Sequence, residues 1–180
     1  MAIDRGYEEL AKKPESYEIC FIPDNDYRGF LKRRVEGLEE EVKGGNFVNT
    51  AGEVIGTHDG YPFYTIGQRK LGVSFGAEAS YVVEIRSETN EVVVGSKEDL
   101  KRLEMYVKDF NLVKYDHIPD GTEALTKVRY KHLGELATLS NEGEEIKALF
   151  HAKVEGITPG QSAVFYEGKD LLGGGFIAKK

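Results

Sequence analysis

Residues 162–178 read SAVFYEGKDLLGGGFIA and contain two short β-type runs, Ser162–Tyr166 and Leu171–Ala178. Four further runs come before them, at Tyr106–Lys114, Glu123–Tyr130, Glu135–Ser140 and Glu145–His151. Six short strands at this spacing predict a small closed β-barrel. The glycines at 173–175 open its last strand, and we expect them to mark a bulge or a crowded corner of the barrel rather than a ligand site.

A second group of β-type runs lies in the middle of the chain and predicts a separate small sheet. Turn-forming residues at Asn49–Glu53 and Glu88–Glu91 predict two hairpins. The runs themselves are Phe47–Thr50, Val54–Gly56, Tyr81–Ile85 and Val92–Gly95. Between the hairpins, Tyr64–Gly72 is typical of neither a strand nor a long helix, so we expect a helical turn or an ordered loop there.

One long helix is predicted ahead of the sheets, from about Asp26 to Lys43. The cluster 24–26 offers N-cap side chains, and Gly44–Gly45 ends the helix. Its apolar residues recur at helical spacing, at Tyr27, Phe30, Leu31, Val35, Leu38 and Val42. We therefore expect a mainly β protein with an N-terminal helical segment (residues 1–45), a small central β domain (46–104) and a six-stranded C-terminal β-barrel (105–180).

The chain of 180 residues is acidic, with a formal net charge of -7. This charge gives no global attraction to nucleic acid, so any RNA contact has to come from local basic clusters. Three such clusters occur, at Arg28 with Lys32–Arg34, at Arg69–Lys70, and at Arg129 with Lys131–His132. The alternative for each cluster is ordinary solvated surface charge.

Cys20 is the only cysteine, so the chain cannot build an internal disulfide. The sequence also has no secretory signal and no apolar stretch near the length of a membrane span, and we expect a cytoplasmic protein. A lone cysteine is either a small buried hydrophobe or a nucleophile. The predicted helix N-terminus and Arg28 would favour its thiolate, whereas Glu18 would oppose it, and both interpretations stay open.

Metal and nucleotide sites are not expected within these residues. The four histidines are widely dispersed and there is no second cysteine, so no metal-binding cluster is predicted. No phosphate-binding loop of the G-x-x-x-x-G-K-[ST] type occurs, so the chain should not bind ATP by itself.

Taken together, the motifs resemble one family, the tRNA-specific 2-thiouridylases, formerly labelled tRNA (5-methylaminomethyl-2-thiouridylate)-methyltransferases. The resemblance covers nearly the whole chain through five ordered matches. These are Ser16–Asp24 with Asp26–Leu31, Gly56–Gly60 with Tyr64–Lys70, Val128–Tyr130, Thr158–Tyr166 and Leu172–Gly175.

The resemblance implies an enzyme that replaces the 2-oxygen of the wobble uridine of tRNA with sulfur. In that family ATP activates the C2 carbonyl by adenylation, and a cysteine persulfide, loaded by a sulfur-donor protein, delivers the sulfur. By position, the persulfide role falls to Cys20. Arg129, Tyr130 and Gln161 match positions implied to contact tRNA, and Arg69 and Lys70 are further candidates.

Two departures from the family pattern have consequences. The family's S-G-G-x-D-S nucleotide loop and its other catalytic cysteine, which belong to an N-terminal domain, are absent here, so we expect this chain alone to be inactive. An extra glycine that the family places between Lys70 and Leu71 is also missing, which affects the local loop and any tRNA contact there.

Two further expectations follow. Without the N-terminal domain, the segment carrying Tyr7, Leu10, Ile19 and Phe21 would either fray or be covered by a second chain in a homodimer. The alternative function is a non-catalytic β-barrel module that binds RNA or a protein, with Cys20 serving only for packing.

Overall fold

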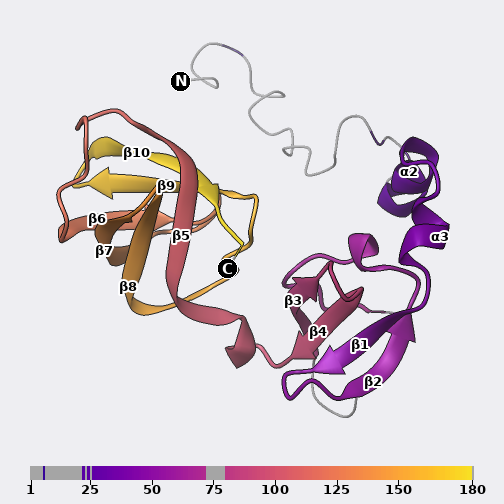
Figure 1. Cartoon of the computed structure of the whole chain (residues 1–180). Coiled ribbons are helices and arrows are strands. Elements are labelled where there is room, and N and C mark those ends of the chain that lie inside the picture. The colour runs from indigo at the N-terminus through magenta and orange to yellow at the C-terminus, as the bar shows by residue number, and fades with distance from the viewer. Residues whose placement is uncertain (1–5, 7–21, 23, 25, 72–79, 180) are drawn as a thin grey trace. The chain divides into compact units, whose positions relative to one another are not determined.

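The computed structural model describes residues 6, 22, 24, 26–71 and 80–179. The chain divides into two units, Met1–Val42 and Lys43–Lys180. The second unit contains a four-stranded sheet and a closed six-stranded barrel, so the predicted mainly β fold is confirmed (Figure 1). Among the described residues, no helix combines the length and the apolar character that crossing a membrane requires.

The first unit contains two short helices, α2 (Tyr27–Arg34) and α3 (Leu38–Val42), and the prediction of one helix from Asp26 to Lys43 is wrong. The chain leaves α2 at Val35, which is extended, and turns at Gly37, whose φ is +75°. The charge distribution also favours two helices. Cations in the last turn of a helix and acidic residues in its first turn stabilise it by interacting with the helix dipole. Three cations end α2 and three acids begin α3, namely Lys32, Arg33, Arg34, Glu39, Glu40 and Glu41.

The N-cap of α2 was predicted correctly. The Asp26 side chain accepts a hydrogen bond from the backbone N–H of Gly29 at 2.8 Å. This bond satisfies one of the amides that the first turn leaves unpaired.

The central sheet has the order β2-β1-β4-β3. Its strands are β1 (Gly45–Asn49), β2 (Val54–His58), β3 (Tyr81–Arg86) and β4 (Glu91–Gly95). Both predicted hairpins are present, since β1 pairs antiparallel with β2, and β3 with β4; β1 and β4 are parallel. Three consecutive valines of β4, Val92–Val94, are buried, so side chains cover both faces of that strand.

His58 ends β2 and is buried in this sheet. Its ring lies 5.0 Å from the ring of Phe47 and 5.2 Å from that of Tyr64. Nδ1 accepts a hydrogen bond from the N–H of Gly60 at 3.0 Å, while the buried Nε2 has no hydrogen-bond partner among the residues that the structure describes. A Cβ at Gly45 would lie closer than 3.0 Å to the imidazole, so the ring requires a glycine on β1. Burial lowers the pKa of His58 below its ordinary value.

This burial predicts a loss of stability in acid. The unfolded chain takes up the His58 proton first, so the contribution of the neutral ring is complete above about pH 6.5 and falls as the pH drops toward the lower folded-state pKa. We expect the urea midpoint to fall between pH 7.5 and 5.5, and to fall less in His58→Gln, whose amide oxygen can still accept from Gly60. The control is His117→Gln, at an exposed histidine. An equal fall in H58Q and the unmodified chain would contradict the assignment.

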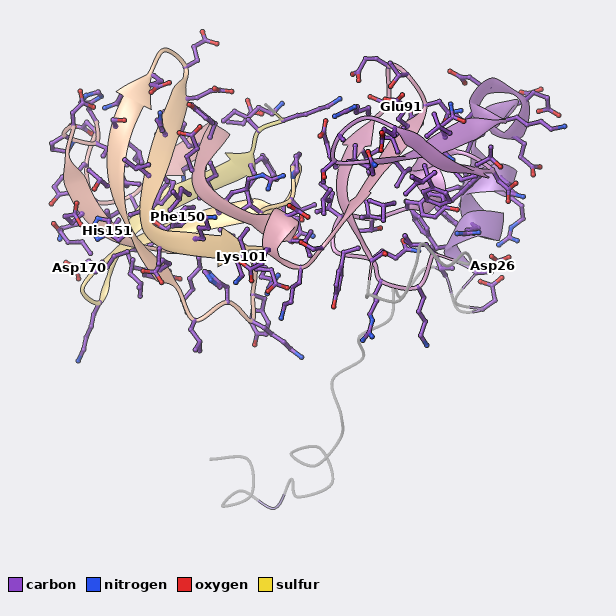
Figure 2. The ribbon with its side chains drawn as sticks, turned by 90° about the horizontal axis from the view of Figure 1, so that it is seen from below. Asp26, Glu91, Lys101, Phe150, His151 and Asp170 are labelled. Carbon is purple, nitrogen blue, oxygen red and sulfur yellow. The ribbon has the colours of Figure 1, made fainter. Side chains whose placement is uncertain are left out.

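The barrel closes in the order β10-β5-β8-β7-β6-β9. Its strands are β5 (Lys101–Leu112), β6 (Thr122–Lys127), β7 (Glu135–Glu142), β8 (Glu145–Glu155), β9 (Ser162–Glu167) and β10 (Asp170–Ile177). Side chains alternate between inside and outside, as Phe150 and His151 show on β8: the phenylalanine is buried and the histidine is exposed (Figure 2). Small and large residues together fill the interior, among them Ala124, Ala137, Leu139, Ala163 and Phe165.

The glycines of β10 lie where neighbouring backbones approach closely. A Cβ at Gly173, Gly174 or Gly175 would lie closer than 3.0 Å to a backbone oxygen of β5 or β9. The register shifts between Leu171 and Gly173 on the β9 side and between Gly174 and Phe176 on the β5 side. The expected bulge or crowded corner is therefore confirmed. It lies on β10, the strand that pairs with both β5 and β9.

Gly174→Ala should destabilise the barrel by roughly 1–3 kcal/mol, because the obstacle is the backbone carbonyl of Ala163 rather than a mobile side chain. Gly143→Ala in the β7–β8 turn is a comparison in which only the backbone conformation matters, because φ is +65° but a Cβ meets open space; the left-handed backbone there costs roughly 1–2 kcal/mol. Chemical denaturation measures both. Gly174→Ala without a loss of stability would show that the crowding at β10 has no effect.

Candidate functional site

Cys20 lies outside the described residues, as do Tyr7, Leu10, Ile19 and Phe21. The sulfur-carrier role and the homodimer therefore stay predictions. The structure describes the other candidate residues, and they fall on the barrel and on the central domain.

Arg129 lies in the turn that follows β6, on the outside of the barrel. Its guanidinium packs on Gly156, where a Cβ would collide with Nη1. Gly156 begins the loop between β8 and β9, and Gln161 ends that loop with an exposed side chain. Backbone bonds hold Gln161 in place: its carbonyl accepts from Ile177 N at 2.8 Å and its N–H donates to Thr158 O at 3.2 Å. The fold thus brings Arg129 against the loop that carries the second predicted contact.

Tyr130 projects from the same turn and is 86% exposed. Leu133, three residues later, is 89% exposed and was missed in the sequence analysis. The backbone between them is a turn closed by His132 N–H donating to the carbonyl of Arg129 at 3.1 Å. Two large, exposed side chains at the tip of a polar turn are typical of a surface that contacts a partner. In the sequence, Leu133 could have been identified by its position close to the Arg129–Tyr130 motif.

The electrostatic environment of this turn is positive. The pKa of His132 is lowered mainly by burial. The charges of Arg129 and Lys127 lower it further, and the charge of Glu135 raises it. In the part of the chain that the structure describes, neither Lys127 nor Arg129 has an ion-pair partner. This acidic protein therefore carries a local cluster of positive charge at the end of β6, with Glu135 as the opposing charge.

Arg69 and Lys70 occupy a different place, in the loop that follows the 3-10 turn η2 (Tyr61–Phe63) of the central domain. Gln68 organises the loop: its side chain accepts from Thr65 N at 3.1 Å and donates to Lys70 O at 2.9 Å, and its carbonyl accepts from Val82 N of β3. The predicted ordered loop is confirmed as far as Leu71; Gly72 is outside the described residues. Both cations are exposed.

No group of three histidine, cysteine, aspartate or glutamate side chains that could hold a metal ion occurs within the described ranges. Outside the central sheet, the described histidines take part in polar contacts on the barrel: His117 contacts Asn141 at 3.3 Å, His132 Nδ1 accepts from Val128 N at 3.5 Å, and His151 Nε2 lies 3.0 Å from a Glu123 carboxylate oxygen. The site is therefore a surface of cations and aromatic rings, which is the chemistry of contact with a polyanion.

Comparison with known proteins gives this surface a context. Residues 28–96 match the family model described as tRNA methyl transferase PRC-barrel domain, and residues 102–177 match the one described as Aminomethyltransferase beta-barrel domain. The first match covers nearly all of α2, α3 and the central sheet, and the second covers nearly all of the barrel.

Similar curated proteins agree with the domain matches. The chain is 54% identical over 179 residues to a tRNA-specific 2-thiouridylase of Cytophaga hutchinsonii, covering 98% of this chain and 48% of the relative. Proteins of the same name from Amoebophilus asiaticus (54% identity) and Salinibacter ruber (51%) match 98% of this chain and 47% and 46% of their own lengths. The chain belongs to the tRNA-specific 2-thiouridylase family, as its motifs predicted. It spans about half the length of the curated relatives it matches.

Proposed function

We propose that this chain provides the sulfur-carrying cysteine and the RNA-facing β domains of an enzyme that replaces the 2-oxygen of the tRNA wobble uridine with sulfur. The observation that carries the proposal is the coincidence of family membership along nearly the whole chain with an exposed cationic turn at Arg129. The motif position and the turn's exposed location support the same role for Arg129, Tyr130 and Gln161. Arg69 and Lys70 would form a separate contact on the central domain.

The chemistry assigned to Cys20 is the transfer of one sulfur atom. ATP supplies the activation, because adenylation of the C2 oxygen turns it into part of a leaving AMP. The terminal sulfur of the Cys20 persulfide then forms a bond to C2 as the C2–O bond breaks. A second thiol has to cleave the remaining S–S bond, and this sequence has no second cysteine, so that thiol comes from outside the chain. A sulfur-donor protein would load Cys20, and a reducing cytoplasm would keep it reduced.

The first test concerns Cys20 in an enzyme assembled by joining this chain to the matching remaining half of a relative. Cys20→Ser should abolish 2-thiouridine formation, measured in digested tRNA by mass spectrometry, while tRNA affinity stays unchanged. After loading by the sulfur-donor protein, the joined enzyme should also carry one added sulfur atom on the Cys20 side chain, measured by mass spectrometry. Full activity of C20S would remove the persulfide role and favour the interpretation of Cys20 as a packing residue.

The second test concerns the cationic turn. Arg129→Ala should weaken binding of unmodified tRNA and lower the slope of log affinity against log salt by about 1, the effect of one lost phosphate contact. Lys108→Ala serves as the control, because β5 lies across the closed barrel from β6. Fluorescence anisotropy at a series of salt concentrations measures both. An unchanged slope in R129A would remove Arg129 from the interface.

A further inference from the structure

Lys127 is the last residue of β6 and the family motif does not include it. Its neighbours Thr126 and Val128 are buried, so the alternation of the strand directs the lysine to the outside of the barrel. Lys127 pairs in register with Val164 of β9, and its Nζ lies 5.7 Å from the centroid of the Tyr166 ring. An ammonium at this distance from an aromatic face is held by a cation–π interaction.

The ring of Tyr166 is itself fixed by its place in the barrel. Tyr166 is the register partner of Leu125 on one side and of Leu171 on the other. Gly134 lies over Leu125, where a Cβ would come closer than 3.0 Å to the leucine side chain. Tyr166 therefore stands in an apolar row across three strands, and its ring restricts where the Lys127 side chain can lie.

Among the described residues, Lys127 forms no ion pair. Two other lysines of the barrel do: Lys114 contacts Glu167 and Asp170, and Lys147 contacts Glu104 and Glu142.

The charges around the neighbouring His132 are of both signs: those of Arg129 and Lys127 lower its pKa, and that of Glu135 raises it. An aromatic ring positions a cation without neutralising it, so the ammonium stays available to an incoming anion.

We propose that Lys127 is a phosphate contact of the RNA surface and that Tyr166 is the residue that positions it. This inference rests on the proposed function. RNA phosphate suits the site better than a protein carboxylate, because the same end of the barrel also presents the exposed ring of Tyr130 and the amide of Gln161, groups that stack on and hydrogen-bond to nucleotides. Lys127 and Arg129 then form one site with two cations. The Tyr166 ring already restricts the Lys127 side chain, so binding costs less conformational entropy.

The experiment separates charge from position. Lys127→Met keeps the stem of the side chain and removes the charge, so tRNA affinity should fall about fivefold and the salt slope should fall by about 1. Lys127→Arg should retain the slope. Tyr166→Leu keeps every charge but removes the ring, so affinity should fall with the slope unchanged, and Tyr166→Phe should restore affinity. Lys108→Met is the matched control on β5.

The outcomes distinguish this inference from the function on which it rests. If Arg129→Ala lowers the slope and Lys127→Met does not, the inference is overturned and the RNA surface stands. If neither variant changes tRNA binding, the RNA surface itself is overturned. Loss of affinity for a polyglutamate peptide in K127M, with tRNA affinity unchanged, would assign the lysine to an acidic protein instead. Circular dichroism of each variant confirms that the barrel is folded.

Discussion

The close passage of β10 between β5 and β9 is the constraint on which the barrel depends. Three consecutive positions, Gly173–Gly175, meet backbone oxygens where a side chain would stand, so the strand can pair on both sides only without Cβ atoms. Closure then fixes the order of all six strands. Because β9 is held by β10, its pairing with β6 is also fixed, and this pairing places Lys127 beside Tyr166. The geometry of the candidate surface is thus a consequence of packing at the glycines.

Charge is distributed unevenly over this frame. On part of the barrel, cations lie beside carboxylates, as in the pairs of Lys114 and Lys147. These exposed pairs add little to stability, but they cancel positive charge locally. At the end of β6, Lys127 and Arg129 have no such pair among the described residues. A protein of net charge -7 repels a polyanion at long range, so under the proposed function a local group of cations would guide the approach of RNA.

Sequence patterns predicted what depends on local signals. Strand periodicity and turn residues gave the barrel and both hairpins, and the run 173–175 gave its crowded corner. The periodicity failed at Gly37, because apolar spacing continued across a break that only the charges at the two helix ends marked. The contact of Arg129 with Gly156 and that of Lys127 with Tyr166 depend on the register of distant strands, which no local pattern encodes. The role of Cys20 and the domain limits at 45 and 104 stay predictions.

The described surface and the proposed chemistry make different demands on the molecule. Sulfur transfer needs a thiol, an activated uridine and a second thiol, whereas the barrel offers cations, exposed rings and amides fixed by its backbone. Such groups can hold and orient RNA but supply no nucleophile. Under the proposed function, binding through these groups would contribute to catalysis by fixing the position of the substrate. A ring that positions a lysine would then influence a reaction in which it takes no chemical part.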